Sequence, residues 1–349
     1  MMTASASAKT ILEPVRHALY DYAEDSVKAA LNKAFTSDAL IQLSHPFGTL
    51  SGPEALYEIA YKPLQASIPD VERRDHIVIS GSSHSNEEWV ACCGYYSGTF
   101  NAPWLDIPPT GHLVTMRFHE FYKVVDGQIT QMQAVWDIVE VMHQANAWPL
   151  APSLGKEWQV PGPATLDGVC NDSGDPKMGL ASRQHIVDML TALLRHPAEG
   201  GPEVMQLEKF WHPKMNWYGP SGIGTARGIN GFRNWHQIPF LNAMPDRGSD
   251  PDGTEFHFIG ERNYAAVTGW PNMIQTLSDG GWLGIAPNGR KISLRSLDFW
   301  RIENGLIREN WVLIDMLDIY RQLGIDVFSR LREFNKARSY RFYSTDNAS

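Results

Sequence analysis

The chain repeats its own pattern at a separation of 178 residues. The block that begins at Phe121 and ends at Asp137 returns as the block from Phe299 to Asp315, with an Asp-Gly or Asn-Gly dipeptide in the middle of each. Nearer the start of each copy the separation falls slightly, which an insertion of a few residues between 269 and 282 explains. Repetition at this period predicts a tandem duplication of one domain.

The repeat divides the chain into two domains. We expect domain 1 over residues 1–150 and domain 2 over 180–335. Residues 151–179 are rich in proline and glycine and show little periodicity, so they are predicted to form the linker. Residues 336–349 form a polar tail that we expect to be loose.

Charge, cysteine count and the distribution of apolar residues disfavour several classes of protein. The formal net charge is -9 and no run of Lys and Arg occurs, so we expect no nucleic-acid partner. Three cysteines are an odd number, which disfavours a disulfide framework and fits a reducing compartment. The N-terminal stretch lacks a secretory apolar core, and no apolar run is long enough to span a bilayer. These features predict a cytoplasmic protein without a membrane partner.

In each copy, helical spacing of apolar residues comes first and strand-like runs follow, which is typical of an α+β fold. The last two strands of each copy are joined by Asp126-Gly127 and by Asn304-Gly305, the dipeptides that most strongly indicate a β-hairpin. The predicted strands cover residues 77–79, 89–96, 114–124, 129–141, 256–259, 264–270, 291–302 and 307–317.

Both copies, and so nearly the whole chain, resemble the SnoaL-like polyketide cyclases of the nuclear transport factor 2-like superfamily. In domain 2 the resemblance rests on the runs Ile285–Arg290, Phe299–Trp311 and Arg321–Gly324 together with Asp315, and in domain 1 on Ile107–His112, Phe121–Val124, Asp126–Ile129 and Asp137. It implies two tandem cone-shaped α+β barrels, each a curved and mainly antiparallel sheet wrapped around N-terminal helices. It also implies that the copies pair as an internal pseudo-dimer, with at most a weak homodimer of the whole chain.

In these cyclases the acid/base residue is an aspartate on the late strand, so the resemblance implies Asp137 and Asp315 as catalytic residues. Each is a lone carboxylate in an apolar run. If it faces a dry pocket, burial raises its pKa and makes it a usable base near neutral pH. The alternative is that each aspartate marks a strand end and faces water.

Neighbouring side chains follow from strand alternation, which places Trp311 on the face of Asp315 and Gln133 on the face of Asp137. We expect both neighbours to contact substrate. Domain 2 keeps the tryptophan that the family has four residues before the aspartate, whereas domain 1 departs from it.

The register of each late hairpin decides which polar residue of the preceding strand lies opposite Gln133 or Trp311. A two-residue turn places Glu120 opposite Gln133 and Asp298 opposite Trp311, whereas a bulged turn brings His119 there instead. The sequence leaves both registers open, and His119 is equally compatible with an ordinary strand histidine.

Further candidates for substrate contact lie at matching positions in the two copies: His45, Tyr218, Trp104 and Trp282. The first two adjoin proline and glycine turns, which explain them equally well, and the tryptophans suit either a pocket floor or a core. The histidines show no metal-ligand spacing, so we expect no metal and no cofactor.

The resemblance implies a cofactor-independent acid/base enzyme acting on a small, largely apolar carbonyl compound by aldol cyclisation, isomerisation or hydration. One alternative is a binding protein or scaffold without catalysis, and another is an epoxide or lactone hydrolase. A buried carboxylate with a raised pKa in the pocket favours an enzyme, and a solvent-facing one favours a binding protein.

Overall fold

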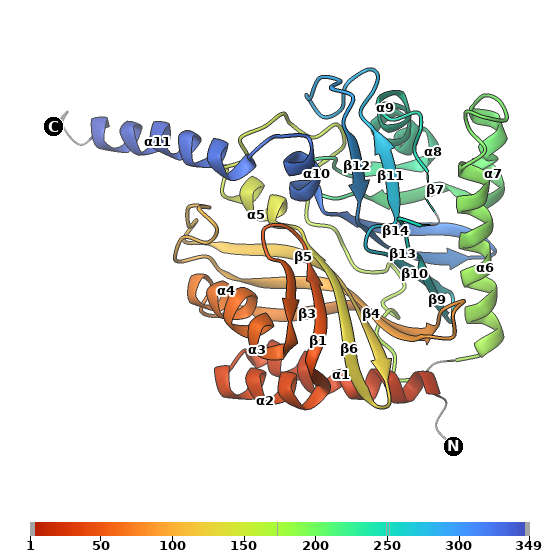
Figure 1. The fold of residues 1–349 in the computed structure, drawn as a ribbon, viewed down its shortest axis with the longest axis horizontal. Coiled ribbons are helices and arrows are strands. Elements are labelled where there is room, and N and C mark those ends of the chain that lie inside the picture. Colours follow the sequence, from red (N-terminus) through yellow and green to blue (C-terminus); the bar gives the residue numbers. More distant parts are fainter. Residues whose placement is uncertain (1–3, 173, 249, 251, 346–349) are drawn as a thin grey trace.

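The computed structural model describes residues 4–345 except 173, 249 and 251. Figure 1 shows two halves of similar architecture, the N-terminal half below and the C-terminal half above. Within the described residues each half contains a six-stranded mixed sheet with helices on its concave side. The predicted α+β duplication is therefore confirmed.

The first half contains α1 (Ala4–Asp21), α2 (Glu24–Ala34), β1 (Phe35–Leu43), β2 (Gly48–Ser51), α3 (Gly52–Leu56), the π-helical turn η1 (Tyr57–Tyr61), α4 (Lys62–Ser67), β3 (Glu72–Ser82), β4 (Glu88–Thr99), β5 (Leu113–Val125), β6 (Gln128–Trp136) and α5 (Ile138–Gln144). Its strand order is β2-β1-β6-β5-β4-β3, and the pair β1–β6 is parallel. The buried residues Leu12, Val15 and Leu19 follow helical spacing, so α1 presents one apolar stripe to the sheet.

The second half contains α6 (Pro176–Leu193), the 3₁₀ turn η2 (Pro202–Met205), α7 (Leu207–Phe210), β7 (Trp211–Tyr218), β8 (Ala226–Arg227), α8 (Gly228–Phe232), the π-helical turn η3 (Arg233–Gln237), α9 (Ile238–Ala243), β9 (His257–Glu261), β10 (Tyr264–Thr268), β11 (Met273–Thr276), β12 (Lys291–Leu294), β13 (Ser296–Glu303), β14 (Leu306–Ile314), α10 (Met316–Gln322) and α11 (Val327–Thr345). Its sheet has the order β8-β7-β14-β13-β10-β9, with β7–β14 parallel, and β11 and β12 form a separate ribbon.

Several predicted boundaries need correction. The predicted strand 291–302 is two strands, β12 and β13, which belong to different sheets. The predicted strands 129–141 and 307–317 are too long, because β6 ends at Trp136 and β14 at Ile314, where the helices α5 and α10 follow. The tail from 336 is helical as far as Thr345 in α11, which extends away from the body in Figure 1. The last four residues, 346–349, lie outside the described part.

Alternation along the last strand of each half separates two apolar environments. In β14, Val312 and Ile314 face the inside of the cone, while Trp311 and Leu313 face the other half. The outward faces of the two sheets share one buried cluster, in which the rings of Phe121 and Phe299 lie 5.3 Å apart. Each residue of a late strand therefore faces either a cone or the boundary between the halves.

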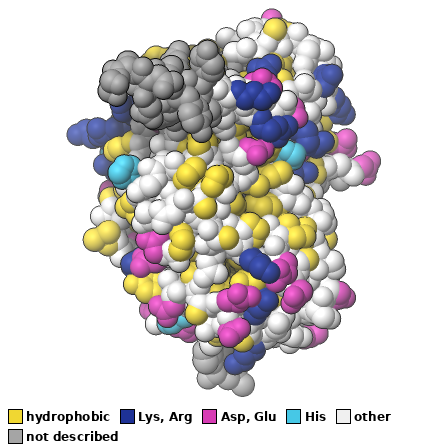
Figure 2. Space-filling view, turned by 90° about the vertical axis from the view of Figure 1, so that its left-hand side faces the viewer, with side chains coloured by type: hydrophobic (Ala, Val, Ile, Leu, Met, Phe, Trp, Pro, Cys, Tyr) yellow, Lys and Arg dark blue, Asp and Glu magenta, His cyan; other side chains and the backbone are white. Residues whose placement is uncertain are grey.

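On the face shown in Figure 2, acidic and basic side chains are interspersed, with hydrophobic side chains between them. None of the helices in the described residues is long and apolar enough to cross a membrane.

Candidate active site

A cavity of about 190 Å³ lies inside the cone of the second half. Helices α6, η3 and α9 supply one wall, and strands β7, β13 and β14 supply the other. The lining is predominantly apolar and rich in aromatic rings, including Trp211, Trp217, Phe232, Phe240, Phe256 and Trp300. A concave, mostly apolar space of this kind with a few polar groups is typical of a small-molecule site.

Asp298 is the carboxylate in this lining. It lies on β13, and its Oδ1 accepts a hydrogen bond of 2.8 Å from the hydroxyl of Ser296. Burial raises the pKa of Asp298 to about 7, and the Ser296 hydrogen bond opposes that shift only in part. In the described part of the chain, Asp298 forms no ion pair. The cavity therefore holds a carboxyl group that is half ionised near neutral pH.

His236 lies in the π-helical turn η3 and also lines the cavity. Its ring stacks on Trp217 with centroids 4.2 Å apart. Burial, assisted by the charge of Arg247, lowers the pKa of His236 to about 3, so the ring is neutral at pH 7. Its Nδ1 atom has no hydrogen-bond partner among the described residues. Since an unpaired buried polar atom is costly, a bound molecule that pairs with it gains affinity.

Asn310 completes the polar set from β14, where it pairs with Trp300 across the hairpin. The side chain is 3% exposed, and its Nδ2 donates a 2.9 Å hydrogen bond to the carbonyl of Phe299. Sequence reasoning considered Asp298 as a contact residue but assigned no role to His236 or Asn310. Strand alternation could have identified Asn310, which lies two residues before Val312 and therefore on the same face of β14. The position of His236 in the helical segment after the Gly228 turn was the corresponding clue in the sequence.

In the first half, the acid at the corresponding position is held by neighbouring side chains. Glu120 occupies the position of Asp298, is 0% exposed, and forms an ion pair with Arg73. It also accepts hydrogen bonds from the hydroxyl of Tyr96 at 3.0 Å and from Nε1 of Trp136 at 2.8 Å. Ala60 stands where the second half has His236, in the equivalent π-helical turn. The two cones therefore differ in chemistry although they share one fold.

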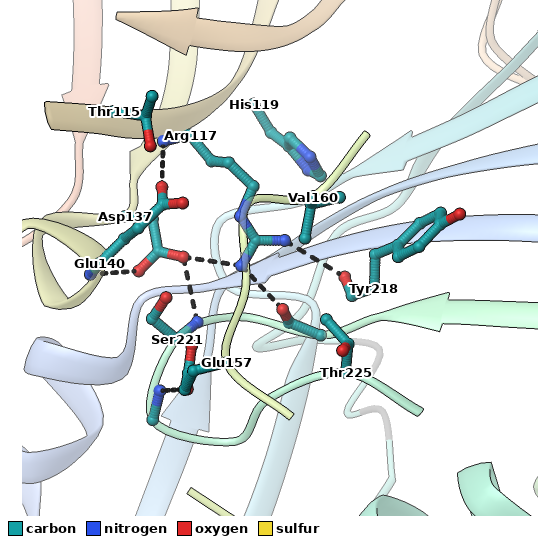
Figure 3. Close-up of polar contacts among 12 residues, drawn as sticks. Thr115, Arg117, His119, Asp137, Glu140, Glu157, Val160, Tyr218, Ser221 and Thr225 are labelled. Carbon is teal, nitrogen blue, oxygen red and sulfur yellow. Dashed lines mark hydrogen bonds and ion pairs between the residues drawn. The ribbon is translucent and has the colours of Figure 1, made fainter. Parts of the chain in front are cut away.

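Asp137 lies elsewhere, between the two halves (Figure 3). It is the N-cap of α5, and its carboxylate accepts from the backbone N–H of Glu140 at 3.2 Å. The same carboxylate forms a 2.8 Å ion pair with Arg117 and accepts a 3.0 Å hydrogen bond from the N–H of Ser221 in the second half. Arg117 also donates to the carbonyl of Gly219 at 2.7 Å.

Asp315 repeats this arrangement with the roles of the halves exchanged. It caps α10 at the N–H of Asp318, lies 3.1 Å from Arg295, and accepts a 3.0 Å hydrogen bond from the N–H of His45 in the first half. Burial, reinforced by the neighbouring charge of Asp318, raises the pKa of Asp315 to about 6, although Arg295 opposes the shift.

The expectation that both aspartates face a strand pocket is therefore wrong. Neither lines the cavity of the second half. Each follows the last strand residue, at the start of a helix, and bonds to the backbone of the opposite half. The alternative, that each marks a strand end, is correct in position, but both side chains are buried rather than solvent-facing.

Both predicted registers are also wrong at this site. The turns do contain two residues, but one extra residue in β6 and one in β14 form a bulge and slip the pairing beyond it. As a result Phe121, not Glu120 or His119, lies opposite Gln133. In the second half Phe299, not Asp298, lies opposite Trp311.

Gln133, His119 and Trp311 all face the boundary between the halves. Gln133 donates to Glu255 at 2.6 Å. The ring of His119 lies 4.9 Å from that of Phe299. The indole of Trp311 donates to the carbonyl of Pro161 at 2.9 Å. The structure thus brings these three predicted contacts together, but outside the cavity.

The remaining candidates are scattered. Tyr218 packs against Trp311 at 5.4 Å in the boundary between the sheets, and the ring of His45 lies 5.9 Å from that of Phe328 on α11. Trp282 is buried behind the cavity, 5.8 Å from Phe240, while Trp104 is buried in the core of the first half.

Comparison with known proteins agrees with this fold. The family model for the SnoaL-like polyketide cyclases matches residues 15–145 and 200–323. Similar solved structures include IdmH from Streptomyces antibioticus, at 20% identity and a TM-score of 0.34, covering 40% of this chain and 98% of IdmH. A SnoaL-like protein from Jannaschia sp. CCS1 has 17% identity and a TM-score of 0.35, over 41% of this chain and 93% of that protein. TsrD from Streptomyces laurentii has 16% identity and a TM-score of 0.34, over 42% and 98%. No curated protein sequence matches the chain.

Proposed function

The chain belongs to the SnoaL-like polyketide cyclase family, and from this premise we propose that the cavity of its second half is an acid/base active site. The substrate is a flat, largely apolar carbonyl compound, and the reaction begins with removal of a proton next to the carbonyl. Isomerisation or an aldol-type ring closure then follows from the same enolate. Asp298 is the proton-transfer group.

The observation that carries this proposal is the state of Asp298. A general base works best when its pKa is near the working pH, because it is then both ionised and able to hold a proton. Burial raises the pKa of Asp298 to about 7. Asp298 can therefore accept the proton from carbon and return it to another position of the substrate.

The negative charge that develops on the substrate oxygen requires hydrogen-bond donors in a dry site. Neutral His236 meets this need in the tautomer that carries its proton on Nδ1, the atom without a protein partner. Asn310 lines the same cavity, but its Nδ2 donates to the backbone carbonyls of Phe299 and Trp311, which leaves its Oδ1 as a hydrogen-bond acceptor. We assign His236 to stabilisation of the enolate.

The aromatic lining of the cavity supports a flat substrate. Trp217 and Trp300 line the cavity, and Phe240 lies next to His236, whose ring centroid is 5.6 Å away. Aromatic walls favour planar apolar molecules through stacking and burial of surface. The first half takes no part in this chemistry, because the pair Arg73–Glu120 occupies its cone.

A proton-exchange experiment tests the proposal without knowledge of the natural substrate. The enolisable ketone 2-tetralone is incubated with the protein in D₂O, and loss of its α-proton signals is followed by NMR. We expect exchange above the buffer rate, and a fall of about a hundredfold or more in Asp298→Asn, which keeps the shape but removes the base.

Glu120→Gln is the matched control, since it makes the same change at the same position of the other half. We expect it to leave exchange unaffected in protein whose folding is verified by circular dichroism. Exchange no faster than in buffer, or exchange that survives Asp298→Asn, would refute the enzymatic role and leave a small-ligand-binding protein as the better account.

A further inference from the structure

Arg247 is a cation on the wall of the same cavity that the proposed chemistry does not use. It lies between α9 and β9 and is half-buried. One of its Nη atoms donates a 2.6 Å hydrogen bond to the carbonyl of Leu193 at the end of α6. Within the described residues, no carboxylate lies within 4.0 Å of its guanidinium. The rest of the cavity wall is mostly apolar and offers the cation little compensation.

Other buried arginines of this chain behave differently. Arg73 pairs with Glu120, Arg117 with Asp137 and Arg301 with Glu309. This follows the general rule that a guanidinium withdrawn from water is compensated by an anion. Burial lowers the pKa of Arg247, and no acidic partner opposes the shift. Among the residues that the structure describes, the half-buried guanidinium of Arg247 thus has a carbonyl partner but no anion.

Arg247 also lies near another polar group of the cavity. Its charge contributes to lowering the pKa of His236, so the two groups are near each other. Asp298 lines the same cavity from β13. A ligand that fills the cavity can therefore meet both the cation of Arg247 and the carboxyl group of Asp298.

We propose that Arg247 binds a carboxylate carried by the substrate, so that the natural substrate is a flat aromatic or polycyclic keto acid. The planar guanidinium fork matches a carboxylate in two parallel hydrogen bonds. The carboxylate replaces the missing protein anion, and the apolar body fills the aromatic part of the cavity. This assignment of substrate class rests on the proposed function, because it uses Asp298 to place the reacting end.

Binding of simple aromatic acids tests the proposal. The probes are benzoic, 2-naphthoic and anthracene-2-carboxylic acid, each compared with its neutral carboxamide at pH 7.5 by isothermal titration calorimetry. We expect at least one acid to bind wild-type protein tenfold or more tightly than its amide. Arg247→Gln should remove that preference and leave the amide's affinity unchanged, which also shows that the variant is folded.

Arg330→Gln is the matched control, because it removes the same charge from an exposed position of α11. We expect it to bind the acids as wild-type protein does. Equal affinities for acids and amides, equal weakening of both by Arg247→Gln, or no binding of any of the three acids would overturn the proposal. This assay needs no turnover, so loss of the acid preference is distinguishable from failure of proton exchange.

Discussion

The same position of the fold carries an acid in both halves, and its neighbours decide what that acid does. Glu120 is surrounded by an arginine, tyrosine hydroxyls and an indole N–H, which occupy its carboxylate oxygens. Asp298 has one hydroxyl partner and an adjoining cavity. The sequence identified both positions, but not this contrast, because Arg73 is 47 residues from Glu120 and only the folded sheet brings them together.

Asp137 and Asp315 are alike in both position and role, and that role is structural. Their retention in both copies suggested catalysis, whereas the structure gives each a helix to cap, an arginine to pair with and a backbone N–H of the other half. Because each aspartate makes the same contacts with the opposite half, the need to hold the two halves together explains why both copies have it. The repeat alone does not distinguish a catalytic role from a joining role.

Substitution of Asp137 should therefore reduce stability rather than chemistry. Asp137→Asn leaves Arg117 buried without its counter-charge, and loss of one partner from a buried pair costs about 3 kcal/mol. We expect a lower midpoint of urea unfolding, with the 2-tetralone exchange rate per folded molecule unchanged. Asp315→Asn should cost little stability near pH 7, since burial and the charge of Asp318 already raise the pKa of Asp315 and disfavour its ionised form. Unchanged stability with lost exchange would restore the catalytic reading.

At the scale of elements, the late hairpins were predictable and their bulges were not. Asp126, Gly127, Asn304 and Gly305 all have positive φ, between 49° and 79°, as the turn type typical of these dipeptides requires. The bulged residues are Thr130 and Arg308, which share no side-chain character. A bulge without a sequence signature therefore changes which residues lie opposite each other, and the predicted contacts changed with it.

The turn itself offers a test of the hairpin. Gly305 has φ of 77°, so Gly305→Ala introduces a Cβ into a left-handed conformation and should destabilise the protein by about 1 kcal/mol. Gly231→Ala is the control, because this glycine lies within α8 and an added Cβ meets its nearest atom at 3.7 Å. We expect the control to be neutral or stabilising in urea denaturation. Equal losses in both variants would contradict the turn assignment.

At the scale of the molecule, duplication allowed the two halves to diverge. The repeat predicted two related domains, and the family match accounts for their shared fold. The chemical difference between the two cones was not predictable, because packing inside a cone depends on many side chains at once. The outward sheet faces bury one apolar cluster made of residues from both halves.

Since those sheet faces are already covered, we expect the chain to exist in solution as a monomer or at most a weak dimer. Sedimentation equilibrium should give a mass near 39.2 kDa at micromolar concentration. A tight dimer across the protein's full concentration range would show that a surface other than these sheet faces drives association.

The state of the Asp298 carboxyl tests the central claim most directly. In protein labelled with ¹³C at the aspartate carboxyl carbon, the resonance that disappears in Asp298→Asn is assigned to this residue and followed by NMR from pH 4 to 9. We predict a midpoint near pH 7, where burial places the pKa of Asp298, and a 2-tetralone exchange rate that rises with pH through the same midpoint because the ionised form is the base. A midpoint near 4, the ordinary value for an exposed aspartate, would contradict the account.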